Sequence, residues 1–205
     1  MGLYEKYLLP SVINFACSSP PVMYQRRLVV PEARGEVLEI GVGSGLNAPL
    51  YNPAKVTKLW ALEPSVAMRE KAADRFAALQ IPYQWLDLPG EQLPLPDQSV
   101  DTVVLTFTLC TIPEPLTALA QIYRVLKADG KLLFCEHGLA PDADIARWQR
   151  RVNPLWKPLA GGCNLYRPID KLLIESGFTL AELQTGYLPK TPKIAGFNYW
   201  GRAHK

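Results

Sequence analysis

The sequence predicts an α/β fold: a doubly wound, mostly parallel seven-stranded sheet with helices on both faces and an antiparallel last strand. Short apolar runs typical of buried parallel strands alternate along the chain with segments of helical periodicity. Three glycines at alternate positions, Gly41, Gly43 and Gly45, directly follow the first of these runs. The chain closes with two extended segments, residues 178–185 and 195–203, which we expect to pair as a hairpin.

The composition indicates one globular domain, residues 1–205, in which 48% of the residues are hydrophobic and 20% are charged. The net charge of +3 is too small to indicate a nucleic-acid partner. The sequence has no signal peptide and no apolar run of about 18 residues, so we expect a cytoplasmic protein. The four cysteines have no Cys-x-x-Cys spacing, and we expect them to be reduced thiols with no metal bound.

The first 30 residues have the pattern of a helical cap. Residues 3–16 are amphipathic and predict a helix broken at Pro10, and residues 22–30 predict a second short helix. Such a cap can cover the mouth of a ligand site, with Tyr7 as a candidate substrate contact, or it can pack on the sheet edge alone. Its apolar face also leaves open a weak contact with a membrane surface.

The glycine turn follows the apolar strand Val37–Ile40 and is expected to lead into a helix capped by Ser44. A dinucleotide fingerprint would have its third glycine where Leu46 stands, and Glu39 would repel a pyrophosphate at short range. S-adenosylmethionine has no phosphate, and its α-ammonium and sulfonium groups are cationic. We therefore predict that Glu39 accepts the ammonium group, directly or through water. A tight turn beside a solvated glutamate is the structural alternative.

A second acidic residue stands where ribose binding requires one. Residues 58–62 predict the second strand, and Glu63 closes it 18 residues after Gly45, near the spacing of about 20 known for ribose-binding acids. Its carboxylate can accept hydrogen bonds from both ribose hydroxyls. Pro64 then opens a helix in which Met68 either packs on the adenine or belongs to the ordinary core.

This order of an acid, Gly-x-Gly-x-Gly and a second acid after the next strand resembles the class I S-adenosylmethionine-dependent methyltransferases. The resemblance implies their fold, S-adenosylmethionine as methyl donor and S-adenosylhomocysteine as product. It also implies that the loop after the third strand, residues 81–87, contacts the adenine. Pro89 replaces the usual acid of that loop, so the acid is either missing or supplied by Asp87. The predicted cofactor-binding residues are Glu39, Gly41, Gly43, Gly45, Asn47, Glu63, Pro64, Met68, Gly90, Glu91, Thr106 and Phe107.

The fourth and fifth strands, residues 101–106 and 131–135, bring further residues to the same end of the sheet. Thr106 and Phe107 are expected to approach the methionyl part of the cofactor mainly through their backbone. His137, just after the fifth strand, is the candidate catalytic residue. It either takes a proton from the attacking group or closes the pocket with a hydrogen bond.

A narrower resemblance rests on Leu-Cys after the fourth strand, Glu-His after the fifth, and then Trp-Gln, Pro-x-Trp-Lys and Gly-Cys. These motifs resemble the alkyl-thiol methyltransferases of mammals and their bacterial relatives, which implies a thiol acceptor. The hydrophobic N-terminal anchor of the mammalian members has no counterpart in residues 1–35. Residues 138–168 are predicted to be a substrate-side insertion. Its Trp148 and Trp156, with Cys110, either line an apolar acceptor pocket or serve as ordinary core.

These observations predict a methyltransferase that acts on a small-molecule acceptor, with a small or apolar thiol preferred. A thiol must be a thiolate to attack, and free thiols titrate near about 8.5, so a dedicated base is optional. Two alternatives stay open: an N- or C-methyltransferase of a phospholipid or quinone, and a non-catalytic protein that binds S-adenosylmethionine. The chain is expected to be a monomer or homodimer.

Overall fold

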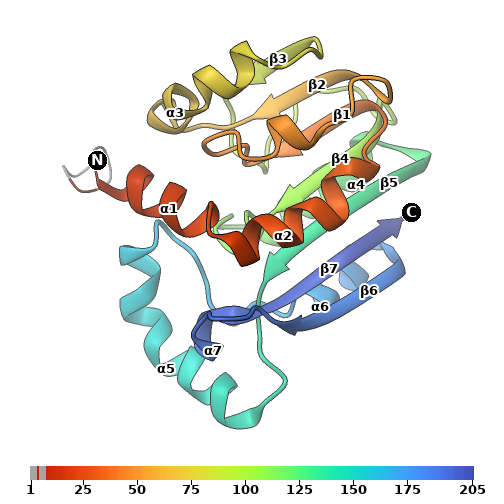
Figure 1. Cartoon of the computed structure of the whole chain (residues 1–205). Helices are drawn as coiled ribbons and strands as arrows, with labels where there is room; N and C mark the ends of the chain where they lie inside the picture. Colours follow the sequence, from red (N-terminus) through yellow and green to blue (C-terminus); the bar gives the residue numbers. More distant parts are fainter. Residues whose placement is uncertain (1–3, 5–7) are drawn as a thin grey trace.

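The computed structural model describes residue 4 and residues 8–205 of the chain. Its strands are β1 (Gly35–Ile40), β2 (Val56–Leu62), β3 (Tyr83–Leu86), β4 (Val100–Thr106), β5 (Leu126–His137), β6 (Thr179–Tyr187) and β7 (Phe197–His204). They form one seven-stranded sheet in the order β3-β2-β1-β4-β5-β7-β6 (Figure 1). β7 pairs antiparallel with both β5 and β6, and the other pairs are parallel, so the predicted sheet and its antiparallel last strand are confirmed.

Helices cover both faces of this sheet. They are α1 (Leu9–Cys17), α2 (Pro20–Val29), α3 (Val66–Ala77), α4 (Pro115–Val125), α5 (Ala143–Leu159), α6 (Ile169–Glu175) and α7 (Lys193–Gly196), with 3-10 helices η2 (Val30–Glu32) and η3 (Ala48–Leu50). Buried side chains of α2 and α3 join the core on one face, and those of α4 and α6 join the core on the other. This two-sided cover is the arrangement predicted for a doubly wound sheet.

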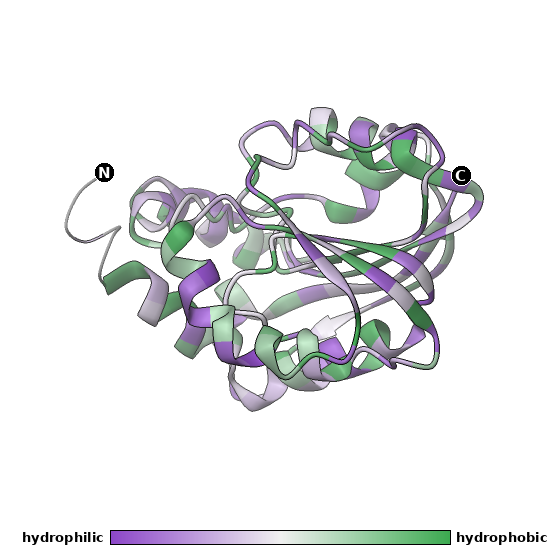
Figure 2. Ribbon diagram, turned by 90° about the horizontal axis from the view of Figure 1, so that it is seen from above, coloured by the Kyte–Doolittle hydropathy of each residue, from purple (hydrophilic) through white to green (hydrophobic). Residues whose placement is uncertain are grey.

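The central strands alternate between the two cores. In β4, Val103 and Leu105 pack with α4 and α6, whereas Val104 packs with α2 and α3, and all three side chains are fully buried. Because both faces are covered, such a strand is a continuous apolar run in the sequence. The surrounding helices are instead striped with hydrophobic and hydrophilic residues (Figure 2). We infer that removal of a side chain such as Leu105 would cost about 2–5 kcal/mol of stability.

Both N-terminal helices have prolines in their first turn. Pro10 lies in the first turn of α1 and does not break it, and α2 likewise begins with Pro20 and Pro21. A proline is tolerated there because the first-turn N–H groups have no intrahelical partner and the ring's fixed φ suits a helix. The helix predicted before Pro10 lies mostly outside the described residues, so the break at Pro10 stays a prediction.

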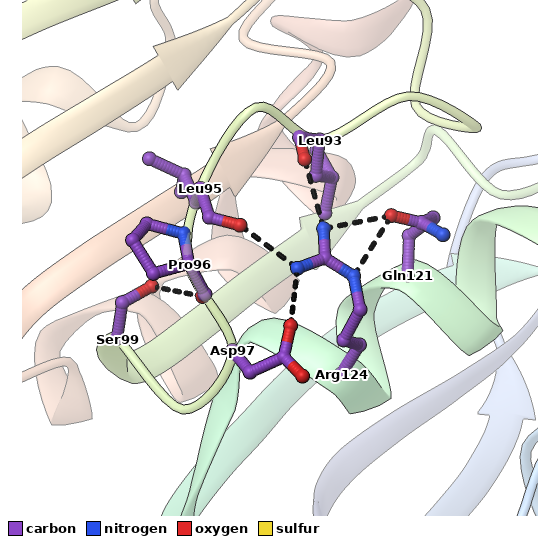
Figure 3. A network of polar contacts seen from close by, with 7 residues as sticks. All are labelled: Leu93, Leu95, Pro96, Asp97, Ser99, Gln121 and Arg124. Atoms are coloured by element: carbon purple, nitrogen blue, oxygen red, sulfur yellow. Dashed lines mark hydrogen bonds and ion pairs between the residues drawn. The ribbon is translucent and has the colours of Figure 1, made fainter.

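An arginine network holds the loop between β3 and β4 against α4 (Figure 3). The Arg124 guanidinium donates to the backbone oxygens of Leu93 and Leu95, both at 2.8 Å, and to the side chain of Gln121. It also pairs with the Asp97 carboxylate at 2.7 Å. The network fixes the chain that follows Glu91, on the rim of the cleft described next.

Candidate active site

A cleft of about 760 Å³ opens at the carboxyl ends of β1, β2 and β4. One wall contains the glycine turn after β1 and the first residues after β2. The opposite wall is formed by α1 and by the segment at the end of α5. Figure 1 shows α1 beside the edge of the sheet toward which the arrows of β1 and β4 point. Ligands of open α/β sheets bind at this edge, near the point where the strand order reverses.

All three glycines of the turn have left-handed backbone conformations. Gly41, Gly43 and Gly45 have φ values of +69°, +58° and +77°, a region that only glycine occupies without strain. A right-handed helix cannot start inside such a turn, so residues 43–47 form turns and only the short η3 follows. The helix predicted to begin near Ser44 is therefore absent.

Each glycine of the turn meets a different neighbour. A Cβ on Gly41 would lie 2.4 Å from the Thr108 side chain, so the ends of β1 and β4 approach closely there. A Cβ on Gly45 would lie 3.1 Å from Ala72 of α3, and Gly45 does not line the cleft. Gly43 does line it, and the atom nearest to its added Cβ would be the Met68 methyl at 3.4 Å. Gly43 is thus the glycine whose missing side chain leaves space for a ligand.

Glu63 joins the glycine turn to the end of β2. One carboxylate oxygen accepts the Gly43 N–H at 2.8 Å and the other accepts the Ser65 N–H at 2.9 Å. The side chain lines the cleft but is only 7% exposed. Burial raises the pKa of Glu63, against the opposing effect of the two amides. Each oxygen keeps a lone pair with which it can accept a ligand hydroxyl. Pro64 and Met68 line the cleft beside it.

Glu39 lies behind the cleft wall and does not line it. It is 1% exposed, and its oxygens accept hydrogen bonds from Asn47 Nδ2 at 2.9 Å and the Tyr51 hydroxyl at 2.7 Å. Burial raises the pKa of Glu39 to about 7, against the opposing hydrogen bonds. The structure therefore gives this acid partners within the protein, so its predicted contact with an ammonium group stays a prediction that would require water or a rearrangement.

A buried arginine completes this network, and no sequence pattern indicated its role. Arg26 of α2 is 6% exposed and donates to Asn47 Oδ1 at 2.9 Å and to the Thr106 hydroxyl at 2.6 Å. The Arg26 guanidinium also lies 5.1 Å from the ring centre of Phe107. Phe107 lines the cleft, and its backbone has a φ of +53°. Asn47 and Thr106 are buried and do not line the cleft, so they support its wall from behind.

The loop after β3 reaches the cleft at Gly90 and Glu91, and their predicted contact with the adenine stays a prediction. The Glu91 carboxylate also accepts the Glu114 N–H at 3.3 Å. Asp87 instead pairs with Arg69 at 3.0 Å, and its side chain is 62% exposed and outside the cleft lining. The structure thus gives no support to Asp87 as the missing acid.

His137 lies beside two cysteines and outside the cleft lining. Its Nε2 is 3.0 Å from Cys163 Sγ, and the ligand atoms of Cys110, His137 and Cys163 all lie within 4.8 Å of one another. The contact with the Cys110 thiol and burial raise the pKa of Cys163. The neighbouring Glu136 accepts the N–H groups of Thr108 and Leu109 with one oxygen, and burial raises its pKa.

The predicted aromatic acceptor contacts do not converge on the cleft. Trp148 of α5 is 55% exposed, and Trp156 is half-buried, and neither lines the cleft. Tyr7 lies outside the described residues. The lining of this end comes instead from Leu9 and Ile13 of α1, which sequence reasoning missed, together with Thr111, Ile112, Lys157 and residues 161–162. The amphipathic pattern of residues 3–16 was the only available sign of the α1 contact.

Comparison with known proteins identifies the family. The family described as a methyltransferase domain matches residues 38–134, which contain the glycine turn and Glu63. Thiol S-methyltransferase TMT1B of Rattus norvegicus is 32% identical over 169 residues, which span 78% of this chain and 68% of that protein. The chain belongs to the class I S-adenosylmethionine-dependent methyltransferases.

Two other members of the wider group are also similar to this methyltransferase. Phosphatidylethanolamine N-methyltransferase of Cereibacter sphaeroides is 32% identical over 105 residues, or 50% of this chain and 51% of that protein. The crystal structure of an S-adenosylmethionine-dependent methyltransferase from Thermotoga maritima has a TM-score of 0.64 at 24% identity and covers 98% of this chain and 97% of its own. That second likeness concerns the fold alone.

S-adenosylmethionine is the methyl donor of this family of methyltransferases, and the cleft suits it. Gly43 leaves its backbone exposed to a ligand. Each Glu63 oxygen accepts one backbone N–H and has a further lone pair that can accept a ribose hydroxyl. Gly90, Met68 and Leu62 offer the apolar surface that an adenine ring requires. Phosphate-binding groups are not needed, and an acid beside the glycine turn favours a cationic cofactor over a pyrophosphate.

Proposed function

We propose that this methyltransferase transfers the methyl group to the sulfur of a small, apolar thiol. The relationship to a thiol S-methyltransferase carries the proposal, because it extends over most of the chain, beyond the family's cofactor-binding segment. The wall of the cleft formed by α1 and α5 supports it independently. That wall presents Leu9, Ile13 and Pro158, with Lys157 as its charged residue. Apolar surface and a cation favour a thiolate with a hydrocarbon chain over an ammonium group.

Positioning supplies most of the catalysis in this proposal. S-adenosylmethionine supplies an electrophilic methyl group, and the two walls of the cleft align the acceptor sulfur with it and exclude water. Such alignment can contribute about 7–11 kcal/mol. Among the described residues that line the cleft, no histidine or cysteine is present to act as a base. We therefore propose that the proton leaves to solvent, and that His137 orients neighbouring groups and does not itself abstract the proton.

We further propose that residues 1–30 are a helical cap and residues 138–168 a substrate-side insertion. Both contribute to the acceptor wall through α1 and the end of α5. The described residues contain no helix long and apolar enough to cross a membrane. Exposed apolar side chains nevertheless lie on both helices, including Phe15 at 81% and Leu155 at 72% exposure. With the nearby Arg150 and Arg151, they support a weak contact with an anionic membrane surface.

That exposed surface also favours the second candidate, methylation of a phospholipid amine or a quinone. A lipophilic acceptor would then reach the cleft from the membrane, and a phosphatidylethanolamine N-methyltransferase is among the relatives. The apolar acceptor wall suits both acceptors, so the reacting atom must be identified directly.

The test is the rate of S-adenosylhomocysteine release with separate thiols, amines, quinols and phosphatidylethanolamine vesicles. The proposal expects the highest kcat/KM with an apolar thiol, and no enzyme-dependent release in the Gly43→Val control. Faster turnover of an amine or a quinol than of every thiol would refute the thiol acceptor. Tight cofactor binding without turnover of any class would instead indicate a non-catalytic protein.

A further inference from the structure

Three soft ligand atoms converge beside the acceptor wall, although they come from distant parts of the sequence. Cys110 follows β4, His137 ends β5, and Cys163 lies in the loop after α5. Their two sulfurs and one imidazole nitrogen all lie within 4.8 Å of one another. No metal-binding spacing is visible in the sequence, because 53 positions separate the two cysteines, as their numbers 110 and 163 show.

The backbone fixes these three positions. β4 and β5 are neighbouring parallel strands, so their carboxyl ends carry Cys110 and His137 side by side. The loop of Cys163 is attached to the same place by the Asn164 N–H, which donates to the Cys110 oxygen at 2.9 Å. Asn153 of α5 also accepts the Leu165 N–H at 2.9 Å through its side chain. The cluster is therefore held by the fold, before any ligand binds.

The geometry points to a Zn²⁺ site made by Cys110, His137 and Cys163, and we propose that its fourth position takes the sulfur of the acceptor thiol. This second part rests on the proposed thiol methyltransferase function. Zn²⁺ prefers tetrahedral sites of sulfur and nitrogen, with bonds of about 2.3 Å to sulfur and 2.0–2.1 Å to nitrogen. Ligand atoms in such a site are about 3.5–3.8 Å apart, so shifts of about 1 Å or less would form it.

The surroundings allow these shifts and supply the charge balance. Cys163 is half-buried, and His137 Nδ1 has no hydrogen-bond partner in the described part of the chain, so a further protein contact holds neither side chain in place. On binding, each cysteine loses a proton to solvent, and the two thiolates neutralise Zn²⁺. Among the described residues, one oxygen of the neighbouring Glu136 side chain is buried without a hydrogen-bond partner.

The cluster lies directly behind the cleft. Thr111 and Gly162 line the cleft, and they are the immediate neighbours of Cys110 and Cys163 in the chain. The Thr111 hydroxyl also lies 3.5 Å from Cys110 Sγ. Three protein ligands and an open fourth position are typical of reactive rather than structural zinc sites. An acceptor thiol that replaced water there would release its proton to solvent and keep its sulfur as a bound thiolate.

The first experiment measures metal binding in the full chain, without turnover. Zinc content of the purified protein is measured, the metal is removed, and Co²⁺ is titrated into the apo-protein as a visible substitute for Zn²⁺. We expect one Co²⁺ per chain, with sulfur-to-cobalt charge-transfer absorption that Zn²⁺ abolishes by competition. Cys110→Ser and Cys163→Ser should each weaken binding by about 100-fold or more, beyond the 10–100-fold typical of outer-shell changes. Cys17→Ser, outside the cluster, is the control and should bind Co²⁺ normally.

The second experiment adds an apolar thiol, or the alcohol of the same carbon skeleton, to the Co²⁺ protein. The thiol should add a third sulfur-to-cobalt band and the alcohol should not. The inference is overturned if Co²⁺ does not bind stoichiometrically, if binding survives both serine substitutions, or if Cys110 and Cys163 form a disulfide that binds no metal. Full-rate thiol methylation by the zinc-free protein would refute the metal's role but leave the proposed function intact. Tight Co²⁺ binding without any thiol methylation would refute the proposed function and the acceptor thiol as fourth ligand. The metal site itself would then still stand.

Discussion

The two walls of the cleft are built in opposite ways. The donor wall comes from the chain between Gly41 and Glu91, and its recognition groups are backbone amides and the buried Glu63 carboxylate. The acceptor wall joins α1 to the end of α5, which are far apart in the sequence, and it presents mainly apolar side chains. In the proposed assignment, cofactor recognition is therefore encoded locally, whereas acceptor recognition depends on long-range packing. Substitutions in the two walls should therefore separate cofactor affinity from acceptor use.

The largest expected effect is on the donor wall at Gly43. Gly43→Val should abolish detectable binding of S-adenosylmethionine, because a β-branched side chain at a φ of +58° is strained and would occupy the ligand space. Calorimetric titration of the folded variant measures this. Gly186→Ala is the matched control, since its Cβ would make an ordinary 3.5 Å contact with Trp200. Normal cofactor affinity in Gly43→Val would show that the donor lies elsewhere.

The next effect concerns the carboxylate of the donor wall. Glu63→Ala should weaken S-adenosylmethionine binding by about 100-fold, since hydrogen bonds to a charged group contribute about 1.5–3 kcal/mol each. The fold should persist, because strand β2 ends before this residue. Equilibrium dialysis of Glu63→Ala beside Asp87→Ala tests the assignment. Asp87 is exposed and outside the cleft, so equal losses in both variants would argue against a specific role for Glu63.

The support behind the donor wall should respond to pH. The pKa of Glu39 is raised to about 7 from an ordinary 4.5. Between these two pH values the Glu39 carboxyl group is protonated in the folded protein and ionised in the unfolded chain. The stabilisation from the neutral carboxyl is therefore complete below about pH 4.5 and is lost as the pH rises through about 7. Relative to Glu39→Gln, the wild type should lose about 3 kcal/mol of unfolding free energy across that window. Urea unfolding of both proteins at several pH values measures it, and parallel curves would refute the raised pKa.

The smallest effect is expected on the acceptor wall. Ile13→Ala should lower kcat/KM for an apolar acceptor by about 10-fold, because removing methylene groups from an apolar pocket costs about 1–3 kcal/mol. Its affinity for S-adenosylmethionine should change little. Val12→Ala is the control, since Val12 lies on the same helix but is 52% exposed and outside the cleft. If Ile13→Ala weakened cofactor binding as much as acceptor use, the two walls would not be separable.

The same difference explains how far the sequence could predict the structure. The strands and one wall of the cleft were predictable, because apolar runs, alternate glycines and an acid at a fixed spacing are local signals. Gly43, Glu63, Gly90 and Phe107 accordingly line the cleft. The turn at Ser44 was mispredicted as a helix, because the left-handed glycines override the capping signal. Pro10 lies in the first turn of α1, and its effect on the chain depends on where the helix begins.

The residues of the acceptor wall could not be predicted, for a physical reason. Trp148 and Trp156 were the conspicuous residues of their segment, yet neither lines the cleft, whereas Leu9 and Ile13 do. The packing of α1 against distant elements decides which apolar residues face a ligand. No local sequence pattern indicates this packing. Arg26 and the convergence of Cys110 with Cys163 are hidden in the sequence for the same reason.

The most direct test of an apolar acceptor wall that selects sulfur is a competition in one reaction. The wild-type protein receives S-adenosylmethionine with an isotope-labelled methyl group, together with an apolar thiol, alcohol and amine of the same carbon skeleton. Mass spectrometry then locates the label. We predict that the label is found on sulfur, and that Ile13→Ala lowers its rate of transfer without moving it to another atom. Label on the amine nitrogen, or label on no acceptor while the cofactor binds tightly, would contradict the proposed thiol methyltransferase.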